Sequence, residues 1–160
     1  MTPDQLNSLT FFRVGERQLD GTEVEWATYD YETMRKVEEL RRFVDAPIRL
    51  IRGAHPGKPT AVDGVCLSVP LTRVVMELTR IPGISFGVYS GNSWHIDRRE
   101  GPPARWLAIR PTERRYLTDY DVAHLVTVEP KDGWIYLPWS GPDGWPCLQL
   151  VCMLAQRARS

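Results

Sequence analysis

The stretch that decides the fold is SFGVYSGNSWHID, Ser85–Asp97. Two short runs rich in apolar and β-branched residues flank the turn residues 90–92, which predicts a β-hairpin. In the second run, SWHID, apolar Trp94 and Ile96 alternate with polar residues, among them His95. Side chains along a strand point alternately to its two faces. We therefore expect Trp94 and Ile96 to pack into a core and His95 to face a cleft or solvent.

The segment upstream of this hairpin predicts two helices and two strands. Residues 31–44 carry apolar side chains at steps of three and four, after Asp30 as N-cap, which is typical of an amphipathic helix. The runs PIRLIRG and AVDGVCL are expected to be strands, separated by the loop GAHPGKPT. A second helix is expected near residues 69–80, with Ser68 as its N-cap and Pro70 in its first turn.

Downstream, the runs AHLVTVE and WIYLPW around residues 130–133 predict another hairpin, and Pro146 opens a last amphipathic helix. The expected fold is α+β, with a small antiparallel-rich sheet flanked by helices. We divide the chain into an N-terminal segment at 1–29, a domain at 30–110 and a C-terminal extension at 111–160. The extension is rich in large aromatic residues, which either stack on sugar rings of a glycan or anchor a core or interface: Trp134, Tyr136, Trp139 and Trp145.

The composition excludes several classes of protein. The 160 residues hold 20 Lys and Arg against 20 Asp and Glu, so the formal net charge is zero. A neutral chain has no electrostatic reason to seek nucleic acid or an acidic membrane. No signal peptide and no apolar run long enough to span a bilayer is visible. Three scattered cysteines do not make a disulfide framework, and we expect synthesis in the reducing cytoplasm.

Three polar residues are candidates for a metal site. His55 follows the first predicted strand, Asp63 lies in the second, and His95 lies in the hairpin. Two histidines and a carboxylate suffice to hold a catalytic zinc ion, which keeps its fourth position open for water. The alternative is that these histidines are hydrogen-bonded structural residues, which is the more common role of a histidine on a strand.

The order of the motifs resembles that of the M15 peptidases, the D-alanyl-D-alanine carboxypeptidase and hedgehog-like zinc fold. The resemblance covers about residues 30–106 and is carried by PIRLIRG, HPGKPTAVD, FGVY, WHIDRR and ARW. It implies that His55, Asp63 and His95 are zinc ligands and that Asp97 supports the site through a hydrogen bond. Direct alignment on Gly53 would instead place His55 where relatives have an arginine.

One position departs from the motif. Many members of that family have a glutamate three residues before the last histidine, where it acts as general base. Here the position is Asn92, an amide that cannot take up a proton. Asn92 and Asp97 are nevertheless the residues that we place beside the reaction.

The resemblance implies a zinc-dependent peptidase that cuts D-Ala-containing peptides of peptidoglycan, of the kind used by phages as a lysin or carried in the virion. The partner would be a peptidoglycan peptide, and the protein would act in the virion or at the cell wall after its synthesis in the cytoplasm. The alternative is a non-catalytic virion component on a degenerate M15-like fold, whose partners are other virion proteins. Neither hypothesis involves nucleic acid or a membrane.

Overall fold

The computed structural model describes residues 1–51, 58–123, 129–138 and 149–154. Six strands form one sheet in the order β1-β2-β4-β3-β5-β6. Only the β3–β5 pair is parallel, and the other four pairs are antiparallel. The strands are β1 (Ile48–Leu50), β2 (Ala61–Cys66), β3 (Ser85–Tyr89), β4 (Ser93–Asp97), β5 (Arg105–Ile109) and β6 (Ile135–Pro138). The prediction of an α+β fold with an antiparallel-rich sheet is confirmed.

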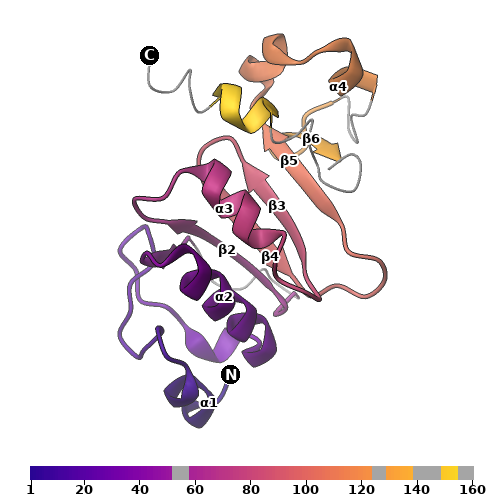
Figure 1. Ribbon diagram of the computed structural model, residues 1–160. Helices are drawn as coiled ribbons and strands as arrows, with labels where there is room; N and C mark the ends of the chain where they lie inside the picture. Colours follow the sequence, from indigo (N-terminus) through magenta and orange to yellow (C-terminus); the bar gives the residue numbers. More distant parts are fainter. Residues whose placement is uncertain (52–57, 124–128, 139–148, 155–160) are drawn as a thin grey trace.

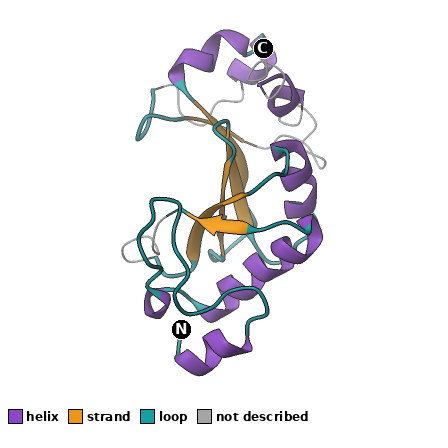
Figure 2. Cartoon of the chain, turned by 90° about the vertical axis from the view of Figure 1, so that its left-hand side faces the viewer, coloured by secondary structure: helices purple, strands orange, loops and turns teal. Residues whose placement is uncertain are grey.

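Two helices, α2 (Tyr31–Val44) and α3 (Leu71–Leu78), pack together and cover one face of this sheet. Figure 1 shows them in front of β2, β3 and β4, and the edge-on view of Figure 2 places the helices along a single side of the strands. Neither α2 nor α3 lies on the opposite face. The remaining elements are α1 (Pro3–Ser8), α4 (Asp119–Ala123) and the 3₁₀ turns η1 (Trp26–Thr28) and η2 (Pro111–Tyr116). Residues 149–154 are also helical.

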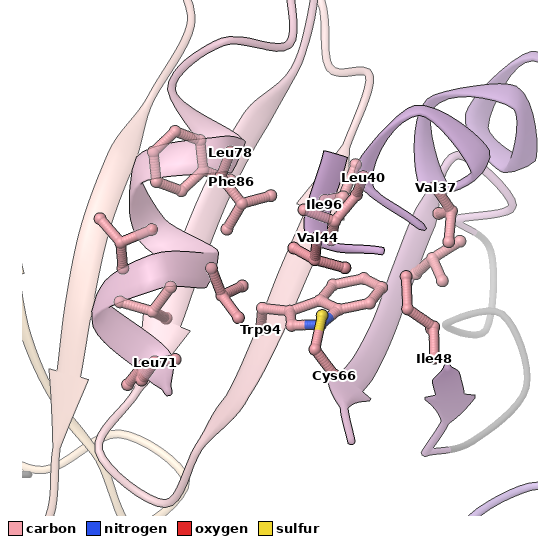
Figure 3. Close-up of a cluster of buried hydrophobic side chains, with 14 of the residues drawn as sticks. Val37, Leu40, Val44, Ile48, Cys66, Leu71, Leu78, Phe86, Trp94 and Ile96 are labelled. Atoms are coloured by element: carbon pink, nitrogen blue, oxygen red, sulfur yellow. The ribbon is translucent and has the colours of Figure 1, made fainter. Parts of the chain in front are cut away.

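The core lies between the helices and the sheet. As predicted, Asp30 caps α2, because its carboxylate accepts the backbone N–H of Thr33 at 2.9 Å. The apolar stripe of α2 then packs on Trp94 and Ile96 of β4, which are both fully buried. Figure 3 shows the Trp94 indole enclosed between β2 and the helices. The labelled core residues around it are Val37, Leu40, Val44, Ile48, Cys66, Leu71, Leu78, Phe86 and Ile96.

The start of α3 differs from the prediction. The helix begins at Leu71 with Pro70 as its N-cap, and no side chain caps it. Ser68, the expected cap, has φ 63° and so lies in the left-handed region instead of the extended conformation of a capping residue. The physical reason for the later start is Pro70, because a proline keeps the residue before it out of the helical region. That residue is Val69, which would have to be the first helical residue if Ser68 were the cap. The predicted buried face of this helix is confirmed, with Val74, Val75 and Leu78 in the core.

The N-terminal segment, where no helix was predicted, contributes α1 and η1 to the fold. It is fastened to α2 by the buried Glu38, whose carboxylate accepts the backbone N–H groups of Thr10 at 2.8 Å and Phe11 at 2.6 Å. Phe12 and Tyr29 reach the core from this segment.

The predicted boundary at residue 110 falls between two paired strands. β5 precedes it and β6 follows it, with Leu107 opposite Leu137 in an antiparallel register. The run WIYLPW thus supplies a strand, and its partner is β5. Most of the other predicted strand of that hairpin, at 124–128, and the start of the last helix, at 146–148, lie outside the described residues. No helix of the described residues is long and apolar enough to cross a membrane.

A candidate metal and ligand site on the open face of the sheet

The register of two strands, β2 and β4, places the predicted polar residues together on the face opposite α2 and α3. Asp63 of β2 is directly opposite His95 of β4, and Ala61 is opposite Asp97. Since alternate residues share a face, Asp63, His95 and Asp97 all lie on the same side of the sheet. The convergence of Asp63 and His95, which are 32 residues apart, is a direct consequence of this pairing.

His95 is held between two carboxylates. Its Nδ1 lies 2.8 Å from Oδ1 of Asp63, and its Nε2 lies 2.8 Å from Oδ2 of Asp97. All three residues are buried, with exposed fractions of 8% for His95 and 5% for each aspartate. An imidazole can satisfy two carboxylates at once only when both ring nitrogens carry a proton. In the absence of a metal, the geometry therefore corresponds to an imidazolium.

Arg99 continues the chain of contacts beyond Asp97. Its Nε donates to Oδ1 of Asp97 at 2.8 Å and its Nη2 donates to Oδ2 at 2.6 Å, while its backbone N–H also reaches Oδ1 at 3.1 Å. Both oxygens of Asp97 thus accept charge-assisted hydrogen bonds, two of them from the planar fork of a guanidinium. The result is a continuous network from Asp63 through His95 and Asp97 to Arg99.

The charges of this network shift the pKa values of its members. Burial alone would lower the pKa of His95, but the hydrogen bonds and charges of Asp63 and Asp97 outweigh burial and raise it above its ordinary value of 6.5. For Asp97, burial opposes ionisation, yet the hydrogen bonds from Arg99 and His95 hold its pKa well below 3.8. Asp97 is therefore a weak base. Burial, together with the charge of Asp63, raises the pKa of Tyr29 to about 12.

A pocket of about 910 Å³ opens over this network. Its volume is within the range that small-molecule sites occupy. Strands β3, β5 and β6 supply aromatic side chains to the wall, and basic side chains come from several elements. The lining residues are Lys58, Thr60, Ala61, Tyr89, His95, Asp97, Arg99, Ala104, Arg105, Trp106, Lys131, Tyr136 and Pro138.

The floor of the pocket depends on a glycine. A Cβ atom on Gly87 would lie 2.0 Å from Cε2 of Trp106, so the indole rests directly on the backbone of β3. Gly87 pairs with His95 on one side and with Trp106 on the other. The Trp106 ring consequently lies beside His95, at 5.3 Å between ring centroids, and the guanidinium of Arg99 lies 5.3 Å from its centre.

Two of the three predicted zinc ligands are brought together. Asp63 and His95 present an oxygen and a nitrogen to each other, which are ligand types that zinc accepts. Asp63 and His95 would hold zinc through these atoms, and the Nε2–H of His95 would donate to Asp97 as the outer partner that histidine ligands commonly have. This set fits zinc in type. No described residues form a group of three or more histidine, cysteine or acidic side chains arranged for a metal, and His55 lies outside the described part.

The two residues placed beside the reaction have different positions. Asp97 lies in the network, with both oxygens occupied, and lines the pocket. Asn92 is exposed in the β3–β4 turn with φ 77°, and it does not line the pocket. Sequence reasoning did not assign a role to Arg99 or Trp106. Arg99 follows the last residue of β4, Asp97, by only two positions, and this short spacing of a guanidinium and a carboxylate was a usable signal for Arg99.

Comparisons of the chain with protein-family models, with curated proteins and with solved structures found no match.

Proposed function

We propose that this chain is a zinc-dependent peptidase that acts on D-Ala-containing peptides of peptidoglycan. The observation that carries the proposal is the meeting of Asp63 and His95 at 2.8 Å, next to a pocket that His95 and Asp97 line, with Asp97 behind the histidine. A carboxylate, an imidazole and an outer carboxylate in this order are the parts of a zinc centre with its supporting partner.

Each residue of the candidate site has a distinct role in this proposal. Asp63 and His95 hold the metal, and His55 is the third ligand. Asp97 accepts the Nε2–H of His95 and fixes the ring so that Nδ1 faces Asp63, and Arg99 in turn fixes Asp97. When bound, zinc supplies a water of lowered pKa and polarises the scissile carbonyl. The pocket above the network receives the peptide and limits its access to bulk water.

The choice of substrate comes from the motifs. The runs HPGKPTAVD, FGVY and WHIDRR resemble those of peptidases that act on D-Ala-containing peptides. The proposal therefore includes a phage-type setting, in which the enzyme is released to the cell wall or carried in a virion after synthesis in the cytoplasm.

Metal analysis of the purified full chain tests the proposal. We expect one zinc per chain after dialysis, and a loss of zinc in His95→Ala, Asp63→Ala and His55→Ala. The matched control is His124→Ala, which removes the third histidine of the chain but none of the proposed ligands. Protein that retains no zinc when purified with zinc present, or that binds equally after His95→Ala, would overturn the proposal.

A second function is favoured by the composition of the pocket. Among the described lining residues the only carboxylate is Asp97, and both of its oxygens already accept hydrogen bonds. Asn92 cannot replace the missing base. These observations favour a non-catalytic virion component that uses the pocket for binding. Zinc binding without hydrolysis of cell-wall peptides, or no zinc binding at all, would support this alternative.

A further inference from the structure

The rim of the pocket carries an excess of positive charge. Lys58, Arg99, Arg105 and Lys131 line it, whereas Asp97 is the only acidic residue of the described part of the chain that does. Arg99 and Asp97 neutralise each other, and so do His95 and Asp63. The charges of Lys58, Arg105 and Lys131 therefore remain, although the whole chain has a net charge of zero.

These three charges are not balanced by the acidic residues that the structure describes. None of them forms an ion pair with a described acidic residue. The segments outside the described residues hold a single acidic side chain, Asp143. At most one of the three could be neutralised by it. A concave site lined by one sign of charge concentrates ligands of the opposite sign.

The three residues approach the pocket from different parts of the chain. Lys58 precedes β2, Arg105 begins β5, and Lys131 precedes β6. Arg105 contributes least, because it pairs with Phe86 on the helix-covered face and its guanidinium lies 5.3 Å from the centre of that buried ring. The two lysines are exposed. The positive charge is thus distributed around the opening and suits a ligand with more than one negative group.

We infer that the pocket binds a short acidic peptide that carries at least two carboxylates. The inference of negative charge comes from the rim alone, whereas the peptide nature of the ligand rests on the proposed function. The aromatic residues Tyr89, Trp106 and Tyr136 supply apolar surface for the backbone and small side chains of such a peptide. The carboxylates lie toward Lys58 and Lys131.

Calorimetric titration of the full chain, freed of metal by a chelator, tests this inference. The probe is acetyl-Ala-Glu-Ala with a free C-terminus, and the comparison peptide is acetyl-Ala-Gln-Ala amide, which has nearly the same size and no charge. We expect the acidic peptide to bind about tenfold more tightly or better, and its advantage to shrink as salt is raised. Equal affinity for the two peptides would overturn the inference.

Paired variants locate the effect. Lys58→Gln with Lys131→Gln should weaken binding of the acidic peptide about tenfold and leave the neutral peptide unaffected. Arg35→Gln with Arg42→Gln makes the same change in net charge on exposed residues of α2, on the other face of the sheet, and should have no effect. If both pairs reduce affinity equally, the charge of the rim does not select the ligand.

Inorganic phosphate serves as the competing anion. Displacement of the acidic peptide by phosphate at lower concentration than by free glutamate would show that the rim is built for phosphate, and the inference would fail. Because the titration is done without metal, its outcome is separate from the zinc analysis. Zinc binding without a preference for the acidic peptide would overturn this inference alone.

Discussion

The two faces of the sheet are made by the same strands but follow different physical rules. On the helix-covered face, Trp94 and Ile96 of β4 lie in a continuous apolar core with no exposed surface. On the open face, His95 and Asp97 alternate with them and are almost as buried, yet they are held by hydrogen bonds and ion pairs. The side chains of the five-residue strand β4 therefore alternate between two environments. Those on one face are stabilised by apolar packing, and those on the other by electrostatic interactions.

A pair of glycines makes the comparison sharper. Gly64 lies beneath the Trp94 indole on the core face, where an added Cβ would come within 2.6 Å of Cζ2. Gly87 lies beneath the Trp106 indole on the open face. Each glycine gives an indole ring room to lie against the backbone. The difference is in what covers the ring, because Trp94 is enclosed by helices while Trp106 is only half-buried and lines a pocket.

The largest expected effect is the loss of the core indole. Trp94→Ala should lower the free energy of unfolding by about 3–5 kcal/mol, because it leaves a large cavity between the helices and the sheet. Trp106→Ala should cost roughly half as much, since part of that ring is already in contact with solvent. Denaturant unfolding followed by circular dichroism measures both. Equal losses would mean that the open face is packed as tightly as the core.

A smaller difference is expected between the glycines. Gly64→Ala should destabilise the fold by about 1–3 kcal/mol, since Trp94 has no space into which it can move. Gly87→Ala should cost less, because Trp106 can swing toward the pocket. That movement should shift the NMR resonances of the His95 ring, which now lies 5.3 Å from the indole. A Gly87→Ala protein with unchanged His95 resonances would show that the indole stays in place.

The sequence was a good guide to the core face and an incomplete guide to the open face. Periodicity predicted α2, the hairpin and the burial of Trp94, because apolar patterning follows the period of each element. Alternation also placed His95 and Asp97 on one face. The predicted start of α3 was wrong because Pro70 keeps the residue before it out of the helical region, so the helix begins only after the proline.

The partners of His95 could not be read from the sequence. Its contact with Asp63 depends on the pairing of β2 with β4, which skips β3 in chain order. The Trp106 contact depends on the parallel β3–β5 pair. Both are long-range consequences of topology, and local patterns carry little information on them. The lysines of the rim are separated by more than 70 residues and are brought together in the same way.

The smallest expected effect is on the pH dependence of stability in metal-free protein, and it distinguishes the two faces most directly. The folded state raises the pKa of His95, so its stabilising contribution is complete below about pH 6.5 and is lost as the pH rises through the raised value. The folded state lowers the pKa of Asp97, so that contribution is complete above about pH 4 and is lost as the pH falls. Stability from this pair should therefore be greatest between about pH 4 and 6.5.

Asp97→Asn should flatten the profile on both sides, because it removes the group that titrates in acid and one of the two carboxylates that favour the imidazolium. Denaturant unfolding across this range, with a His95 resonance followed by NMR, measures both changes. Trp94→Phe, on the core face, is the control and should lower the whole curve without changing its shape. If Asp97→Asn instead lowers the curve uniformly, the network contributes through packing, and the two faces would obey the same rule after all.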